Sequence, residues 1–310
     1  MDLSIIIPAY NRLWSLPETI ESCRGGHCLK EIIVVDDGSN DGTYEWLNKQ
    51  NDIITLRQSH LGKCWAVNKA FQIAKGKYIR FLDADDLLFP SANDEQLSLG
   101  SLTSADIVVS GYQTFNNLKQ TLKKQMWIET NDFIAQQLGE CDSSHYSAYL
   151  FKRTFIENIP HRPDFAFRDD RLFVLEAALK YPKVAIHKGT ALLHRIHYAD
   201  RLQVSSGLKQ EVQNFQHLHI YKNILQQLEL EGRLTKRHID AVLKILWPLA
   251  HWIAKNHLDE AEEVVKWIYN LDPGFSIPDR GLLGMLYRHL GFKNAERILK
   301  LRRQLIEIWK

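Results

Sequence analysis

The segment Ile32-Ile33-Val34-Val35-Asp36-Asp37-Gly38-Ser39 decides the fold, because a short β-branched run ends abruptly in acidic and turn-forming residues. A near-continuous apolar run of this length is typical of a strand buried on both faces of a sheet. The pattern recurs where Ile5-Ile6-Ile7 precedes Pro8-Ala9-Tyr10-Asn11 and where Phe81-Leu82 precedes Asp83-Ala84-Asp85-Asp86. Three buried strands are therefore expected to end in polar clusters.

Working outward from these runs, strands and helices alternate through the first ninety residues. The expected strands are Leu3–Ile7, Glu31–Val35, Ile53–Leu56 and Tyr78–Leu82, and the expected helices are Leu16–Cys23, Thr43–Lys49 and Trp65–Ala74. This alternation predicts an α/β fold with a mostly parallel, Rossmann-related sheet flanked by helices. In such folds ligands bind at the carboxyl ends of the strands, where the polar clusters lie.

The remaining chain is mixed and then wholly helical. Further strands are expected at Ile107–Tyr112, Ala148–Phe151, Val184–Ile186 and Leu192–Ile196, with helices at Asp132–Leu138 and Leu172–Lys180. Only helical periodicity follows Ser205, which indicates four or five helices. We therefore expect a binding and catalytic domain over residues 1–205 and a helical domain over residues 206–310.

The composition is that of an ordinary globular protein, since 45% of the 310 residues are hydrophobic and 25% are charged. The net charge of +2 gives no support to a general nucleic-acid-binding role, which needs a strongly basic surface. Residues 280–310 hold eight Lys or Arg and two Glu, which leaves −4 for residues 1–279. A mildly acidic body thus ends in a basic tail.

The N-terminal residues lack the basic region of a signal peptide, and the apolar run after them stops at Pro8. The longest apolar stretch, residues 241–254, is shorter than the roughly 20 residues that span a bilayer. A cytoplasmic location is expected. The cysteines lack the pairing of a zinc site and are expected to be buried thiols; they are Cys23, Cys28, Cys64 and Cys141.

The cluster at residues 83–86 predicts a cation site. In an extended segment residues i and i+2 face the same way, so Asp83 and Asp85 can share one crevice. Two adjacent carboxylates repel, and Mg²⁺ or Mn²⁺ relieves this repulsion and can also hold a diphosphate. A lone Asp-x-Asp is more often a solvated turn, but its place at the carboxyl edge of a sheet favours the metal site. In haloacid dehalogenase-type phosphatases the motif usually follows the first strand, whereas here it follows the fourth.

The second strand supplies a carboxylate suited to a nucleotide base. Asp37 can accept the ring N–H of a pyrimidine, and Tyr10, just past the first strand, offers an aromatic face for stacking. The alternatives are turn chemistry for the acidic pair and a partly buried core position for Tyr10.

At this point the sequence resembles the family 2 glycosyltransferases of the GT-A fold. The resemblance rests on the segments 5–11, 33–43, Ala66-Val67-Asn68-Lys69-Ala70 and 76–86, in this order and at family-like spacing. It implies an inverting transferase that uses a nucleotide diphosphate sugar, with UDP favoured. The implied nucleotide-sugar residues are Pro8, Tyr10, Asn11, Asp37, Asn68, Asp83 and Ala84, with Pro8, Tyr10 and Asp37 around the base, Asp83 near the ribose and Asp85 on the metal.

One departure from the family concerns a phosphate contact. Many members have Ala-Arg-Asn where this chain has Ala66-Val67-Asn68. The phosphate or base contact that this arginine often makes must therefore come from another side chain. Lys63, one helical turn earlier, is a candidate. Its alternative is a solvated residue at the start of a helix.

The resemblance also implies a catalytic base. Asp169-Asp170 resembles the acidic pair at the start of a family helix, which assigns Asp170 as general base and Asp169 as its neighbour. A carboxylate in a first helical turn is also plain dipole complementarity. The family usually has an Arg six residues later, where this chain has Glu176. His197, in the family's Arg-x-His register, is implied beside the metal; its alternative is a satisfied histidine at a strand end.

The acceptor is expected to be a saccharide, lipid-linked in one version of the hypothesis, in bacterial surface polysaccharide synthesis. The basic tail suggests peripheral contact between the C-terminal helix and an anionic membrane, against the ordinary alternative of a helix packed on its neighbours with a solvated basic face. Other hypotheses are a nucleotidyltransferase, disfavoured by the first strand's lack of a Gly-rich loop, and a binding protein without catalysis. A dinucleotide-dependent oxidoreductase is disfavoured because no G-x-G-x-x-G follows the first strand.

Overall fold

The computed structural model describes residues 1–117, 119–197 and 207–308. The chain divides into two compact units, the first comprising Met1–Gln137 and Asp142–Leu202 and the second Leu138–Cys141 and Gln203–Lys310. The predicted boundary at Ser205 lies outside the described residues.

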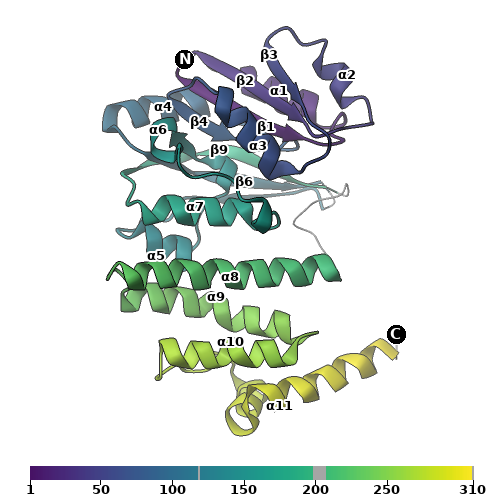
Figure 1. The fold of residues 1–310 in the computed structure, drawn as a ribbon, viewed down its shortest axis with the longest axis vertical. Coiled ribbons are helices and arrows are strands. Elements are labelled where there is room, and N and C mark those ends of the chain that lie inside the picture. Colours follow the sequence, from purple (N-terminus) through teal and green to yellow (C-terminus); the bar gives the residue numbers. More distant parts are fainter. Residues whose placement is uncertain (118, 198–206, 309–310) are drawn as a thin grey trace. The chain divides into compact units, whose positions relative to one another are not determined.

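The first unit is built on a parallel half-sheet. Its strands β1 (Leu3–Ala9), β2 (Lys30–Asp36), β3 (Ile53–Arg57) and β4 (Tyr78–Phe81) lie in the order β3-β2-β1-β4 (Figure 1). All three pairings are parallel, as predicted. Ile5, Ile6 and Ile7 are fully buried in the central strand, which agrees with a strand covered on both faces.

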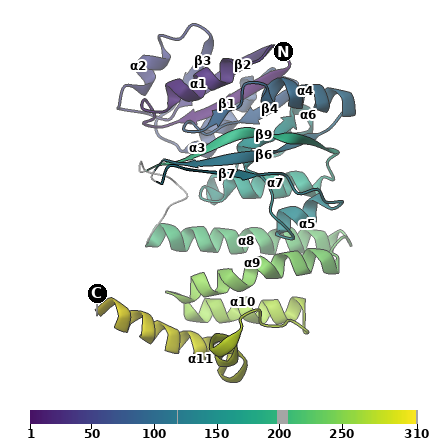
Figure 2. The same ribbon diagram turned by 180° about the vertical axis from the view of Figure 1, so that it is seen from behind.

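The second half of the sheet is mixed. Its strands are β5 (Leu87–Leu88), β6 (Ile107–Asn116), β7 (Thr121–Gln125), β8 (Leu150–Lys152) and β9 (Val184–Ile196). Among the described residues they extend the order as β4-β8-β6-β9-β5, with β7 on β6. Only β6 and β9 pair in parallel here (Figure 2).

The structure corrects several boundaries. The two strands predicted at Val184–Ile186 and Leu192–Ile196 are a single strand, β9, the strand predicted to end at Tyr112 continues to Asn116, and the helix predicted from Leu172 begins at Asp169. Strand β9 carries a bulge between the two predicted strands: Ser110 pairs with His187, Gly111 with Thr190 and Tyr112 with Leu192, so residues 188, 189 and 191 are skipped in the pairing and the strand continues beyond them. One strand therefore runs from the sheet interior to the edge that carries the polar clusters.

Helices cover the sheet. They are α1 (Leu16–Arg24), α2 (Thr43–Leu47), α3 (Lys63–Ile73), α4 (Ala92–Thr103), α5 (Phe133–Leu138), α6 (Arg153–Ile156) and α7 (Asp169–Leu179), with 3-10 turns η1 (Tyr146–Ala148) and η2 (Pro163–Phe165). Helix α3 packs on β1 and β2, and α4 packs on β6 and β9.

A buried arginine joins α4 to η1. Arg80 on β4 is fully buried and donates to Asn93 Oδ1 at 3.0 Å, to the carbonyl of Ser147 at 2.8 Å and to Gln96. Burial lowers the pKa of Arg80 to about 10, so the guanidinium is charged at neutral pH and needs these acceptors. Helix α4 therefore buries polar side chains and lacks the apolar stripe from which a helix is predicted in a sequence.

The second unit is helical, as predicted. Its helices are α8 (Leu208–Leu230), α9 (Lys236–Ala254), α10 (Leu258–Leu271) and α11 (Gly281–Ile308). A capping box at Thr235 begins α9, and Trp247 on α9 contacts the rings of Phe275, Tyr287 and Phe292. Helix α11 is interrupted at Gly291, where φ is 76°. No described helix has the length and apolar character needed to span a bilayer.

The four cysteines are free thiols. Cys23 and Cys64 are buried as predicted, whereas Cys28 and Cys141 are partly exposed. Cys28 lies on the loop before β2, where it packs against the edge of the core, and Cys141 lies on the segment after α5.

Candidate active site

The loops after β1 and β2 are bound to each other. The backbone N–H of Asn11 donates to Ser39 Oγ at 2.8 Å, and Asn11 Oδ1 accepts the N–H of Asn40 at 2.9 Å. Asn11 has a φ of 52°, a conformation that asparagine tolerates better than most residues. The predicted site residue Asn11 thus holds the two loops together.

Asp37 presents a buried carboxylate beside an exposed aromatic ring. Its oxygens accept from Gln58 Nε2 at 2.7 Å and from the N–H of Gly62 at 3.0 Å, and His60 Nδ1 lies 3.4 Å away. The Tyr10 ring is 39% exposed and lies 4.0 Å from the His60 ring, centroid to centroid. A planar base can stack on this ring while hydrogen-bonding to the acidic loop.

The edge of the sheet near Asp37 also has a hollow and the paired end of β1. A hollow opens beside Asp37, lined by Gly38, Arg57, Gln58 and Ser59. Pro8, which is half-buried, pairs with Val35 at the end of the β1–β2 ladder. Three of the predicted base-site residues, Pro8, Tyr10 and Asp37, therefore lie at one edge.

Lys63 joins two of the predicted acidic residues. Its Nζ lies 2.8 Å from Asp83 Oδ1 and 3.2 Å from Asp170 Oδ1, and all three side chains are mostly buried. Burial opposes the charged form of Lys63, but Asp170 and Asp83 outweigh it and raise the pKa of Lys63 well above its usual value. Burial likewise opposes the charge on Asp83, yet Lys63 and His145 hold the pKa of Asp83 below its usual range.

The neighbouring carboxylate Asp169 is used inside the protein. Its Oδ2 pairs with His161 Nδ1 and its Oδ1 accepts the N–H of Arg162 at 2.7 Å. Tyr146 contacts the other nitrogen of His161 at 2.8 Å. Asp170, next along α7, is left to face Lys63.

Asn68 is bound to this same network. Its amide donates to the carbonyl of His161 at 2.8 Å and accepts the N–H of His161 at 2.9 Å. Its side chain is thus committed to backbone in this structure, and α3 is joined to the segment that precedes α7.

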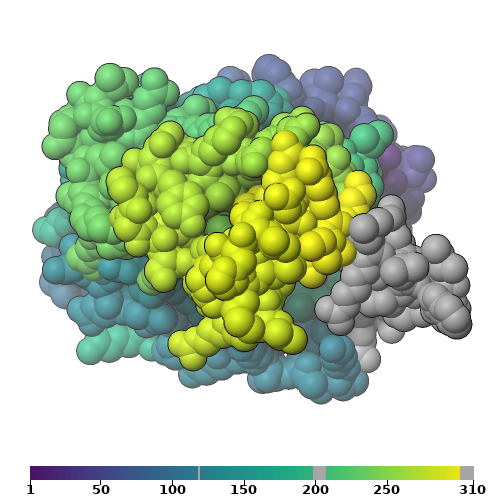
Figure 3. All heavy atoms as spheres, turned by 90° about the horizontal axis from the view of Figure 1, so that it is seen from below, coloured from purple at the N-terminus to yellow at the C-terminus, as the bar shows by residue number. Residues whose placement is uncertain are grey.

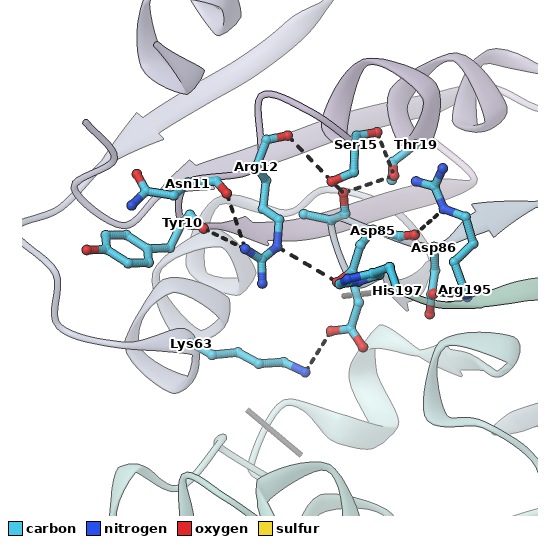
Figure 4. Close-up of polar contacts among 12 residues, drawn as sticks. Tyr10, Asn11, Arg12, Ser15, Thr19, Lys63, Asp85, Asp86, Arg195 and His197 are labelled. Atoms are coloured by element: carbon cyan, nitrogen blue, oxygen red, sulfur yellow. Dashed lines mark hydrogen bonds and ion pairs between the residues drawn. The ribbon is translucent and has the colours of Figure 1, made fainter. Parts of the chain in front are cut away.

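Asp85 faces a histidine and an arginine. Its Oδ2 lies 3.0 Å from His197 Nε2 and 3.8 Å from Arg12 Nε (Figure 4). The His197 side chain is buried and its ring meets the edge of Trp14 at 4.6 Å. Its Nδ1 has no hydrogen-bond partner among the described residues.

The loop that holds Asp85 is fixed from both sides. The carbonyl of Ala84 accepts the hydroxyls of Ser15 at 2.9 Å and Thr19 at 3.0 Å (Figure 4). The carbonyl of Asp85 accepts Nε of Arg195 from β9. The loop is therefore pre-organised by α1 and β9.

A second histidine pair surrounds the buried Asp86. His194 Nδ1 lies 3.1 Å from both Asp86 oxygens, and the His145 ring stacks on the His194 ring at 4.6 Å. Burial lowers the pKa of His145. Its Nδ1 accepts the N–H of Ser147 at 3.2 Å, so a neutral His145 carries its proton on Nε2 and acts there as a donor.

The predicted metal ligands fit a divalent cation. Asp85 Oδ2 and His197 Nε2 are hydrogen-bonded at 3.0 Å, so a carboxylate oxygen and an imidazole nitrogen face the same point. Carboxylate and imidazole ligands suit Mn²⁺, and carboxylate alone suits Mg²⁺. Two other groups of potential ligands lie close by, namely Asp86 with His145 and His194, and His161 with Asp169 and Asp170.

Arg12, His145 and Arg195 were assigned no role from the sequence. The signal for Arg12 was available, because it follows Asn11 directly at the carboxyl end of β1. Arg195 lies within the Arg-x-His register that was used only to assign His197. His145 has no local pattern, and it reaches the site through the turn η1.

Comparisons with known proteins find glycosyltransferases. Residues 4–157 match the model of glycosyl transferase family 2. A poly(ribitol-phosphate) beta-glucosyltransferase of Bacillus spizizenii is 28% identical over 197 residues, which is 60% of this chain and 31% of the relative. A UDP-Glc:alpha-D-GlcNAc-diphosphoundecaprenol beta-1,3-glucosyltransferase of Escherichia coli is 43% identical over 88 residues, 27% of this chain and 35% of the relative. The chain thus spans about a third of the length of these relatives.

Solved structures share the fold. TarS residues 1–349 of S. aureus, in complex with UDP-GlcNAc, superpose with a TM-score of 0.60 at 15% identity, covering 98% of this chain and 92% of that one. The mannosyltransferase PcManGT of Pyrobaculum calidifontis, in complex with GDP-Man and Mn²⁺, has a TM-score of 0.54 at 16% identity, with 96% and 86% covered. The predicted GT-A fold is confirmed.

Proposed function

Because the chain belongs to glycosyltransferase family 2, we propose that it transfers a sugar from a nucleoside diphosphate, with UDP favoured, to a saccharide hydroxyl with inversion. The observation that carries the proposal is the contact of Lys63 with both Asp83 and Asp170. One ammonium group places the carboxylate proposed for the donor beside the carboxylate proposed as base, within one site.

The donor is assigned to the first unit. Tyr10 stacks on the base, and the Asp37 loop with Pro8 surrounds it. Asp83 binds the ribose. Arg12 and Lys63 neutralise the diphosphate and so take the place of the arginine that many family members have where this chain has Val67. Support comes from the exposed Tyr10 ring and from the orientation of Arg12 toward Asp85 (Figure 4). UDP-GlcNAc in a structure of similar fold is consistent with a UDP-linked donor.

Asp170 is the proposed general base. It removes the proton from the acceptor hydroxyl as that oxygen attacks the anomeric carbon, and the bond to the diphosphate breaks in the same displacement. A single displacement inverts the anomeric configuration. Asp169 cannot replace it, because its two oxygens are bonded to His161 and the backbone of Arg162.

Asp85 and His197 are proposed to hold the cation, Mn²⁺ or Mg²⁺. When bound there, the cation stabilises negative charge on the departing diphosphate. The His197 ring is kept in place by Trp14 and the Asp85 loop by Ser15, Thr19 and Arg195, so little reorganisation accompanies binding.

The acceptor is proposed to be a growing bacterial surface saccharide, carried on a lipid at the cytoplasmic face of the membrane. The names of the relatives, which include a diphosphoundecaprenol acceptor, support this class.

The test is a screen of nucleotide sugars for metal-dependent hydrolysis and transfer, followed by two variants. Asp170→Asn should keep UDP affinity within about threefold and lower transfer by about 10²-fold or more, because it removes the base and keeps the shape of the side chain. Asp85→Ala should abolish the increase in UDP affinity that Mn²⁺ causes. Undiminished transfer by Asp170→Asn would remove this residue from the reaction, and nucleotide incorporation with pyrophosphate release would indicate a nucleotidyltransferase.

A further inference from the structure

The first segment of α11, residues 281–290, exposes a row of large apolar side chains. The exposed fractions are 83% for Leu282, 38% for Leu283, 45% for Met285 and 44% for Leu290. Leu282 and Met285 lie three residues apart and Leu283 and Leu290 lie seven apart, so each pair shares one side of the helix and the two pairs together form one broad apolar strip over adjacent sides. Figure 3 shows α11, in yellow, at the surface of the second unit.

The opposite side of this segment is firmly packed. Tyr287 is buried, its ring stacks on Phe292, and its hydroxyl donates to the buried Glu296 at 2.7 Å. The edge of the Trp247 indole meets Tyr287. This packing fixes the rotation of the helix about its axis, so the apolar strip on the opposite side faces the solvent.

Cations flank the strip. Arg280 precedes the helix and Arg288 lies beside Met285, and both are exposed. Among residues 280–300 the acidic residue is Glu296, which is buried, against five Lys or Arg. Lys293 is bound to Asp259 at 2.6 Å and Glu262 at 3.0 Å, and Arg288 donates to the backbone carbonyl of Asp279 at 3.3 Å. Arg280 and Arg288 are the cations nearest the strip in the sequence.

We propose that this lipid-facing strip, defined as Leu282, Leu283, Met285 and Leu290 with Arg280 and Arg288, rests on an anionic membrane surface. Apolar side chains enter the boundary between headgroups and acyl chains, and the guanidinium groups contact lipid phosphates. The inference rests on the proposed function, in which the acceptor is carried on a lipid. It places the contact in the first segment of α11, before the break at Gly291.

The charge of the strip decides against a second copy of the chain as its partner. In a two-fold dimer the same patch lies on both sides of the interface, so each Arg280 and Arg288 meets a patch of its own sign. An anionic bilayer satisfies the apolar and the cationic side chains together.

The experiment is flotation of the full-length protein with vesicles of phosphatidylcholine alone or mixed with phosphatidylglycerol. The protein should float with the anionic vesicles and less so at high salt, because salt screens the arginine contacts. Leu282→Glu with Met285→Glu should lower the bound fraction about tenfold or more, since it places two charges in the apolar strip. Arg280→Gln with Arg288→Gln should abolish the preference for phosphatidylglycerol.

A matched control is available on the other unit. Leu102 on α4 is 85% exposed, nearly the same as Leu282, and Leu102→Glu should float like the unaltered protein. Thermal unfolding of each variant checks that the fold is intact. A protein that stays wholly in the soluble fraction overturns the proposal, as does an equal loss in Leu102→Glu. A change of mass in solution on Leu282→Glu, without flotation of the unaltered protein, assigns the strip to self-association and also overturns it.

Nucleotide-sugar hydrolysis measured on the same samples separates this proposal from the proposed function. Hydrolysis without flotation rejects the membrane surface alone. Flotation without hydrolysis or transfer from any donor rejects the proposed function and leaves the membrane surface in place.

Discussion

Lys63 lies in a cluster of charged side chains in the first unit. It lies between Asp83 and Asp170, and each of the three side chains is no more than a quarter exposed. Lys63→Met should lower the free energy of unfolding by about 2 kcal/mol at pH 7, below the ~3–5 kcal/mol of a fully buried pair. Chemical denaturation measures this loss. Lys266→Met, which removes an exposed pair with Glu263, should cost no more than about 0.5 kcal/mol.

The same variant has a defined pH dependence. The pKa of Asp83 is lowered in the folded protein, so its contribution is complete above the unfolded pKa of about 4 and is lost as pH falls through the folded pKa. The pKa of Lys63 is raised, so its contribution is complete below about 10.4 and is lost above that value. The difference between Lys63→Met and the unaltered protein should be constant from about pH 5 to pH 9 and shrink toward pH 3. An equal difference at pH 3 and pH 7 would contradict the ion cluster.

Residues within a motif were predictable, and residues that reach the site from afar were not. Asp83 and Asp85 were predicted from their residue type and their place after a strand, and Asp170 from the resemblance to the family. The bonding of Asn68 to the backbone of His161 joins positions 93 residues apart, and no local pattern announces it. The roles of all predicted site residues stay predictions until the variants are made.

At the scale of elements, Gly76 determines how closely the turn after α3 approaches β1. A Cβ at Gly76 would lie 2.3 Å from the backbone nitrogen of Ser4 and 2.5 Å from the carbonyl carbon of Leu3. Gly76→Ala should therefore lower the free energy of unfolding by about 3 kcal/mol, since backbone must move. Denaturant unfolding provides the measurement.

Gly25 provides the control for this prediction. It has an ordinary φ of −59°, and its added Cβ would meet atoms no closer than 3.5 Å. Gly25→Ala should change stability by less than about 1 kcal/mol in either direction. Equal effects of the two substitutions would show that contact with β1 is not the cause.

Strands and helices with a clear hydrophobic periodicity were predicted, and those that depend on contacts with distant parts of the chain were missed. The four strands β1 to β4 and the helices α1 and α3 have the expected type within two residues at each end, because their apolar patterns state which faces are buried. The buried residues of helix α4 include polar side chains that accept hydrogen bonds from Arg80. Strand β5 is two residues long and is stabilised by its pairing with β9. Such elements are specified by tertiary contacts, and the local sequence carries little of that information.

For the whole molecule, the division into two units predicts how a ligand acts on unfolding. UDP with Mn²⁺ at about 100 times its dissociation constant stabilises the unit that binds it by about 2.7 kcal/mol. Differential scanning calorimetry should show the transition of the first unit rising by about 5–11 °C and that of the second unit unchanged. Chelation of the metal should reverse the metal-dependent part of the shift. Equal shifts of both transitions would contradict the assignment of the donor to the first unit.

Strand β9 also has a consequence for biosynthesis. His194 and His197 meet Asp86 and Asp85 across 108 and 112 residues of chain, so the contact closes a long loop. A polypeptide still on the ribosome can form the parallel half-sheet long before β9 emerges. The two histidines therefore join their aspartates only after β9 has emerged, and the nascent chain has an open acidic edge until then.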